Sequence, residues 1–257
     1  MTYRYFIKLS YQGSKYHGWQ IQPNATTVQE ILNRDLSLLL SEEIKLTGCG
    51  RTDTGVHAKV FYAHFDTAKE NLETDSDFVY KINGKLPSDI SIHEILKVKP
   101  EAHARFDAIS RTYEYHIQRT KEIFHRELAH FIYGDMDIDA IKSAAAVLKE
   151  YTDFTSFSKV DTDVKTNDCK IYHATWEASD QKLVFRISAD RFLRNMVRAI
   201  VGTLLEVGFG KINLAEFRQI IESRNRSNAG TSAPAKGLFL TDVEYPPELF
   251  LIGPDQS

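Results

Sequence analysis

One glycine-rich segment places a carboxylate and a guanidinium in the same short turn. Its sequence is GCGRTDTGVHA, residues 48–58, and apolar stretches lie on both sides of it. Glycines permit backbone angles that expose a short side chain at the tip of a turn. We therefore expect Asp53 to face a ligand, ionised beside Arg51, where a carboxylate can act as a nucleophile or base. The same residues also suit an Asx turn without chemistry, and the spacing alone leaves both possibilities open.

Three arginines recur at helical spacing in the second half of the chain. Residues 191–207 are predicted to form a helix, and at 100° per residue Arg191, Arg194 and Arg198 fall within a stripe of about 60°. No acidic residue lies on that stripe, whereas a solvated helix face usually mixes both signs. Residues 182–211 contain six basic and two acidic residues. The pattern favours a local anion-binding surface, with an ordinary solvated face as the alternative.

The composition predicts a globular protein. Of 257 residues, 42% are hydrophobic and 26% are charged, and the net charge of −3 excludes a protein that is basic throughout. No apolar run approaches the roughly 18 residues needed to span a bilayer, and residues 1–5 lack the apolar core of a secretory signal. The two cysteines are too few for a disulfide framework. We expect a cytoplasmic protein with no membrane contact.

Periodicity predicts an α+β fold in two halves, residues 1–108 and residues 109–257. In the first half we expect strands at 3–11, 44–47, 56–65 and 90–98, and helices at 27–40 and 76–86. In the second half we expect strands at 111–119, 169–178, 182–189 and 237–245. Its helices are predicted at 138–149 and 191–207, with a further one capped by Asn213 and Glu216. Gly208 is predicted to be a left-handed C-cap of the 191–207 helix.

The segment GRTDTGVHA, residues 50–58, resembles the catalytic signature of the tRNA pseudouridine synthase A family. The resemblance spans nearly the whole chain, and its blocks follow the order of the family. They are KYHGWQ (15–20), LPSDI (86–90), HARFDA (103–108), RTYEY (111–115), DFTSF (153–157), FLRNMVR (192–198) with Val201-Gly202, and APAKGL (233–238).

The resemblance implies a pseudouridine synthase fold. In that fold, helices pack on a mainly antiparallel sheet, and two ferredoxin-like or RRM-like α+β halves enclose a basic cleft. The half at residues 1–108 would hold the catalytic aspartate loop. The half at residues 109–257 would hold the tyrosine strand and the arginine-rich helix.

The resemblance also implies the reaction. Members of the family isomerise uridine to pseudouridine in the anticodon arm of tRNA, near positions 38 to 40. The C1′–N1 bond breaks, the uracil turns, and C1′ joins C5. No atom is gained and no redox change occurs, so neither a cofactor nor a metal ion is expected. Family members act as homodimers in which one tRNA contacts both subunits.

Three residues match the catalytic positions of the family. Asp53 matches the aspartate that attacks C1′ or removes a proton from C2′. Tyr113 matches the tyrosine that stacks on uracil and serves in removing the C5 proton, although a strand tyrosine can equally be a core residue. Arg198 matches the basic partner expected to pair with Asp53.

Five further residues are candidates for RNA contacts. Arg51 is placed to fill the gap left by a flipped uridine or to hold its phosphate. Arg191 and Arg194 are expected to meet phosphates. Arg105 and Lys236 are weaker candidates for backbone contacts, because each could equally be a surface charge.

Two other functions remain as alternatives. A non-catalytic RNA-binding module of tandem RRM-like units would use the basic surface, but it would have no need of Asp53. A glycosidase-like hydrolase needs a second carboxylate as its acid, and the glycine-rich segment offers only one. His57 is expected to orient the loop, and Cys49 is expected to pack.

Overall fold

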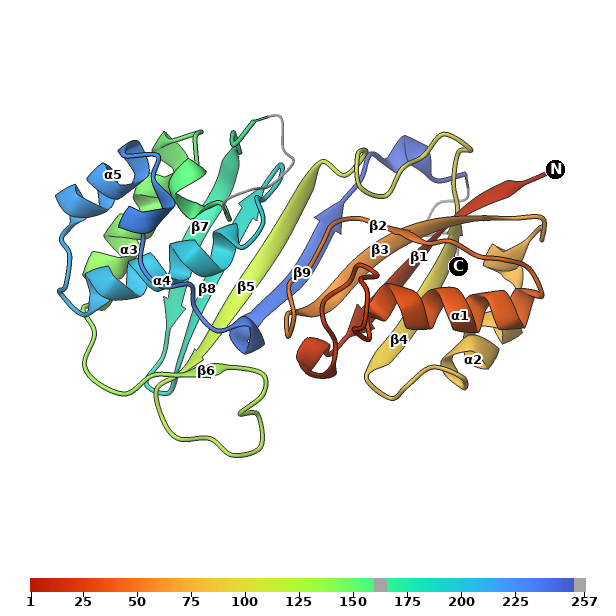
Figure 1. Cartoon of the computed structure of the whole chain (residues 1–257), viewed down its shortest axis with the longest axis horizontal. Coiled ribbons are helices and arrows are strands. Elements are labelled where there is room, and N and C mark those ends of the chain that lie inside the picture. The colour runs from red at the N-terminus through yellow and green to blue at the C-terminus, as the bar shows by residue number, and fades with distance from the viewer. Residues whose placement is uncertain (160–165, 252–257) are drawn as a thin grey trace. The chain divides into compact units, whose positions relative to one another are not determined.

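The computed structural model describes residues 1–159 and 166–251 and shows a mixed α/β protein with mostly antiparallel strands (Figure 1). The predicted α+β class with a mainly antiparallel sheet is confirmed. Contacts divide the chain into two compact units. Unit 1 comprises Met1–Ile109 and the segment that starts at Leu240, and unit 2 comprises Ser110–Phe239. The segment after residue 239 therefore joins unit 1, although the sequence placed it in the second half.

In unit 1, the strand β1 (Tyr3–Tyr11) has a partner on each side. It pairs antiparallel with β3 (His57–Thr67) and with β4 (Ile90–Lys97). The short β2 (Thr47–Gly48) pairs with β3, and β9 (Leu238–Glu244) follows β3 in the strand order.

Both faces of β1 are covered, and this explains why the C-terminal segment belongs to unit 1. Tyr5, Phe6 and Ile7 are consecutive residues of the strand, so they alternate between its two faces, and all three are fully buried. The ring of Phe6 packs edge-on against Tyr245, 5.2 Å away, and against Phe250, 6.1 Å away. These aromatic contacts attach the C-terminal segment to the first strand of the chain.

The helices of unit 1 are α1 (Val28–Leu40) and α2 (Ser76–Asn83), which contact each other. The Thr27 hydroxyl accepts a hydrogen bond from the backbone of Glu30 and so caps the N-terminus of α1. The buried side chains of α1 recur at helical spacing, with Val28, Leu32 and Leu36 fully buried. This apolar stripe packs into the unit, and α2 packs beside β4.

In unit 2, three strands pair antiparallel in the order β5 (Ser110–Gln118), β8 (Lys182–Ala189) and β7 (Ile171–Ala178). An unpredicted two-residue strand, β6 (His130–Phe131), pairs parallel with the end of β5. The helices α3 (Ile138–Val147), α4 (Met196–Gly208) and α5 (Leu214–Glu222) pack together (Figure 1). Asn213 and Glu216 form the predicted capping box. Within residues 1–159 and 166–251, no helix has the length and apolar content needed to span a membrane.

The prediction of a helix from residue 191 is wrong. Helix α4 begins at Met196, because Asn195 adopts a left-handed conformation with φ 67°. The amide side chain of Asn195 donates a 2.6 Å hydrogen bond to Ser232, and the Arg194 carbonyl accepts one from Lys159. Arg191 and Arg194 therefore lie in a non-helical segment before α4, and the predicted helical stripe of three arginines does not exist.

Gly208 is not the left-handed C-cap that the sequence predicts. It is the last residue of α4, and a Cβ atom there would overlap the Ile141 side chain of α3. The left-handed residue is Gly210, with φ 66°, two positions further on. The glycine at 208 permits close packing of two helices, and the one at 210 permits the turn.

Replacing Gly202 tests how tightly α4 packs against the backbone of Thr231. A Cβ atom at Gly202 would overlap the carbonyl oxygen of Thr231, which is backbone and cannot rotate away. We expect Gly202→Ala to lower the free energy of unfolding by about 1–3 kcal/mol, measured by urea denaturation. Gly84→Ala is the matched control, because Gly84 has right-handed helical angles and a Cβ atom there would make only ordinary van der Waals contacts. It should raise stability by about 0.4–1 kcal/mol, and equal effects at both sites would contradict the packing argument.

Candidate active site

The signature loop, residues 49–56, connects β2 to β3 in unit 1. The Asp53 carbonyl accepts a 3.1 Å hydrogen bond from the amide of Val56, which closes a four-residue turn. Gly55 has a φ of +79° at the third position of this turn, a conformation that glycine adopts without strain. Asp53 is half-buried, whereas Arg51 and Thr54 are exposed. The predicted turn at the glycine-rich segment is therefore present, with Arg51 at the surface.

The N-terminal loop, residues 12–20, holds the signature loop by hydrogen bonds. The amide of Gly13 donates a 3.0 Å bond to Nδ1 of His57, which is almost completely buried. Nδ1 must therefore be unprotonated, so the imidazole is a neutral acceptor here. Just before this loop, the Tyr11 hydroxyl lies 2.9 Å from the Thr52 hydroxyl, next to Asp53. His57 thus orients the loop, as the sequence predicts.

Two glycines allow the backbones of these loops to approach closely. A Cβ atom at Gly13 would overlap the Val56 carbonyl, and one at Gly18 would overlap the Thr52 carbonyl. Gly18 also has a φ of +84°, which disfavours any larger residue. The signature loop is therefore fixed on both sides of Asp53 by backbone that no side chain separates from it.

Tyr113 and Arg198 both belong to unit 2. Tyr113 lies on β5 opposite Ile187, and its half-buried ring meets that of Phe192 edge-on at 5.2 Å. Arg198 lies on α4, where its Nε donates a 2.8 Å bond to the Ala233 carbonyl. The amide of Ala233 in turn donates to the Arg198 carbonyl at 2.9 Å. These reciprocal bonds fix the base of the Arg198 side chain.

Tyr115, on the same strand as Tyr113, bonds to the segment that holds the side chain of Arg198. Burial raises the pKa of Tyr115, and the positive charge of Arg198 opposes this rise. The hydroxyl of Tyr115 donates a 2.8 Å bond to the Pro234 carbonyl, beside Ala233. Tyr115, two residues along β5 from Tyr113, thus bonds to the segment that also holds the side chain of Arg198. The pairing of Arg198 with Asp53 stays a prediction.

The candidates for RNA contacts lie outside the α-helices and β-strands. In unit 1, Arg105 is exposed, and its guanidinium lies 5.6 Å from the ring of Phe106. In unit 2, Arg194 is exposed and Arg191 is half-buried. Lys236 donates a 3.0 Å bond to the Arg126 carbonyl, so its ammonium is fixed in place.

Phe106 is an exposed aromatic side chain that the sequence patterns did not single out. Its side chain is 72% exposed and packs on His103 with a ring separation of 4.3 Å. An exposed aromatic ring beside an arginine is typical of surfaces that stack on bases. The indication in the sequence is an aromatic residue between two charged ones, Arg105 and Asp107, in a polar turn.

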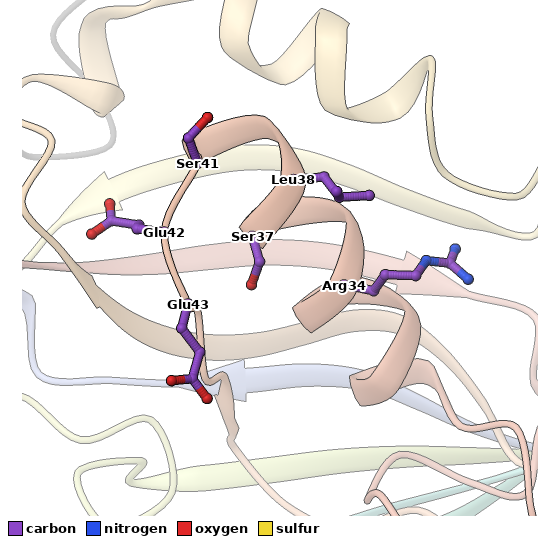
Figure 2. A pocket seen from close by; sticks show the side chains of 6 residues that line it. All are labelled: Arg34, Ser37, Leu38, Ser41, Glu42 and Glu43. Carbon is purple, nitrogen blue, oxygen red and sulfur yellow. The ribbon is translucent and has the colours of Figure 1, made fainter.

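A pocket in unit 1 is formed by the C-terminal end of α1 and the residues after it (Figure 2). The opposite end of α1 bonds to the N-terminal loop through the Gly18 carbonyl, and 13 helical residues span about 20 Å. The pocket's polar groups already have structural partners, since Glu42 bonds to Thr67 and Ser37 bonds to the amide of Ile44. We assign this pocket no role in the candidate active site.

The residues that the structure describes contain no candidate metal site. Across residues 1–159 and 166–251, no three His, Cys, Asp or Glu side chains gather in a way that could hold a metal ion. His57 and His64 bond separately to the amides of Gly13 and Ala104. Cys49 is buried, in agreement with a packing role.

Comparisons with known proteins agree with the signature. The model of the tRNA pseudouridine synthase family matches residues 8–107 and 144–246. These ranges include Asp53 and Arg198, whereas Tyr113 lies between them.

Three relatives named tRNA pseudouridine synthase A are similar over nearly their full length. The relative from Bacteroides fragilis is 54% identical over 248 residues, which cover 96% of this chain and 98% of the relative. The one from Bacteroides thetaiotaomicron is 53% identical, with coverage of 96% and 92%. The one from Parabacteroides distasonis is 52% identical, with coverage of 96% and 98%. This chain therefore belongs to the tRNA pseudouridine synthase family.

Proposed function

We propose that this protein is an isomerase that converts uridine to pseudouridine in tRNA. The observation on which this rests is 54% identity to a tRNA pseudouridine synthase A across 96% of the chain. The reaction breaks the C1′–N1 bond, rotates the uracil and joins C1′ to C5, and C5 loses a proton while N1 takes one up. A non-catalytic RNA-binding module fits less well, because the similar proteins are named as synthases.

Asp53 is the proposed catalytic group. Its carboxylate either attacks C1′ as the C1′–N1 bond breaks, or removes a proton from C2′ to give a glycal. Both routes need an ionised carboxylate at a fixed position beside the sugar, where positive charge develops. The closed turn at residues 53–56 and the half-buried side chain of Asp53 support this role.

Tyr113 and Arg198 are the proposed partners of Asp53. The ring of Tyr113 would stack on the uracil, and its hydroxyl would serve in removing the C5 proton. Arg198 would pair with Asp53 and keep it charged. The bond from Nε of Arg198 to Ala233 supports this, because it limits the positions that the guanidinium can reach. Residues 1–108 and 109–257 would thus each supply part of the site.

The proposed RNA contacts are basic side chains around this site. Arg51 would fill the space of the flipped uridine, and it is exposed on the loop that contains Asp53. Arg191, Arg194, Arg105 and Lys236 would contact phosphates. The excess of basic residues between 182 and 211, in a chain of net charge −3, supports a local RNA surface.

The finer assignment follows the family. We propose that the substrate is the anticodon arm, near positions 38 to 40, that the protein acts in the cytoplasm, and that it forms a homodimer with one tRNA contacting both subunits. The isomerisation is internally balanced, so the proposal includes no cofactor.

Asp53→Asn tests the catalytic assignment. The amide has nearly the same shape but cannot act as nucleophile or base, so we expect pseudouridine formation to fall by more than about a thousandfold. Tritium release from tRNA labelled at uridine C5 measures the rate. Asp77→Asn, an exposed residue of α2, is the control and should keep full activity. Normal tritium release by Asp53→Asn would refute the assignment.

Replacing Arg191 and Arg194 together by Ala tests the phosphate contacts. We expect weaker tRNA binding and a plot of log affinity against log salt that is flatter by about one unit for each phosphate that is no longer neutralised. The matched control replaces the exposed Lys142 and Lys149 of the same unit by Ala, which removes equal charge. The phosphate role is wrong if both double variants show the wild-type salt slope in filter-binding titrations.

A further inference from the structure

The N-terminal loop is anchored to unit 1 away from the signature loop. Its first residue, Gln12, donates a 2.9 Å bond to the Asp89 carbonyl in the turn before β4. Near its other end, the indole of Trp19 stacks on Phe61 at 4.1 Å. The loop therefore has fixed attachments from which it can hold another segment in place.

Asp89 adds a side-chain attachment at the middle of the loop. One carboxylate oxygen accepts a short hydrogen bond from the phenol of Tyr16, and the other lies 3.2 Å from the ammonium of Lys15. The Asp89 side chain is 9% exposed, whereas that of Lys15 is 77% exposed. An ion pair to so exposed a lysine is weak, so the bond to Tyr16 is the principal one.

The Asp89 carboxylate stays ionised in this setting. Burial alone would raise its pKa, but the hydrogen bonds from Tyr16 and Lys15 outweigh burial and lower it. The pKa of Tyr16 is raised, first by burial and then by its bond to Asp89. The phenol therefore remains the donor and the carboxylate the acceptor at neutral pH.

The backbone of Tyr16 passes this attachment to the signature loop. Its carbonyl accepts a 3.3 Å bond from the amide of Gly55, two residues after Asp53. On the other side of Asp53, the carbonyl of Thr52 accepts a 3.4 Å bond from the amide of Trp19. The N-terminal loop therefore bonds to the signature loop on both sides of Asp53 through backbone groups.

We infer that Asp89 and Tyr16 are positioning residues for Asp53, acting through the chain of bonds from the Asp89 carboxylate to the Tyr16 phenol and from the Tyr16 carbonyl to Gly55. This inference rests on the proposed function, because it assigns Asp53 the reacting group. A carboxylate displaced by about 1 Å from its reactive position can lose about a hundredfold in rate. The two residues set that position without touching substrate.

Tyr16→Phe breaks the chain at its phenol and keeps the buried ring. We expect the single-turnover rate of pseudouridine formation to fall about 10- to 100-fold, with the tRNA dissociation constant changed less than about twofold. Amide exchange at residues 52–56 should become faster, because the residue 16 carbonyl that accepts from Gly55 is no longer held in place by the phenol.

Tyr5→Phe is the matched control. Tyr5 is also fully buried in unit 1, and its hydroxyl donates a 3.2 Å bond to the Lys69 carbonyl. The Tyr5→Phe variant also loses a tyrosine hydroxyl, but one that does not bond to the N-terminal loop or the signature loop. Its rate of pseudouridine formation and its amide exchange at residues 52–56 should therefore match those of the wild type.

Asp89→Asn separates positioning from general stability. In the Tyr16→Phe background it removes a buried charge that has lost its main donor, so the melting temperature should recover while the rate does not. Recovery of the rate together with the melting temperature would overturn the inference. A Tyr16→Phe rate equal to that of Tyr5→Phe, or a loss of rate matched by an equal loss of tRNA affinity, would do the same.

Failure of the proposed function gives a different result. If the wild type formed no pseudouridine, the catalytic proposal would fall and the positioning of a reacting group would fall with it. Faster exchange at residues 52–56 in Tyr16→Phe alone would then show that the bond chain exists without that reaction. Active wild-type protein with unchanged exchange in Tyr16→Phe would overturn only the positioning role of Tyr16 and Asp89.

Discussion

The backbone of the N-terminal loop packs closely against the signature loop on either side of Asp53, and the geometry of the candidate site in unit 1 depends on this contact. The carbonyls of Val56 and Thr52 occupy the space that Cβ atoms would need at Gly13 and Gly18. Backbone is less mobile than any side chain, so loops held this way have few alternative positions. The side chain of Asp53 itself is not required for that contact. The carboxylate can therefore be directed at a ligand while the peptide units around it are held by the fold.

In unit 2, Arg198 is fixed in a similar way, by backbone hydrogen bonds and close packing. The backbone of Ala233 exchanges hydrogen bonds with the backbone and the guanidinium of Arg198. Gly202, one turn further along α4, lets Thr231 lie directly on the helix. Gly237 does the same for the end of this segment, because a Cβ atom there would press on the ring of Tyr115. In both units a charged side chain thus projects from backbone that glycines allow to pack closely.

Local patterns predicted most elements because they depend on nearby residues. The bounds predicted for the strands at 3–11 and 182–189 match those of β1 and β8 residue for residue. The start of α4 could not be predicted in this way. Arginine and phenylalanine suit a helix, but Asn195 turns left-handed and bonds to Ser232, far along the chain. The two-residue β6 likewise depends on a partner strand and has no periodicity of its own.

The same distinction between local and distant contacts applies to the candidate site. Asp53 was found because its glycines and arginine are neighbours in sequence, whereas the bond between Tyr16 and Asp89 joins two separate motifs. The predicted stripe of Arg191, Arg194 and Arg198 was wrong because it assumed that all three lie on one helix. The side chain of Asp190 accepts a 2.7 Å hydrogen bond from the amide of Arg191, and residues 191–195 form a non-helical segment before α4. Arg191 and Arg194 are therefore not separated by the helical repeat. Any contacts that they make with phosphates would depend on the path of residues 190–195 and not on one helix face.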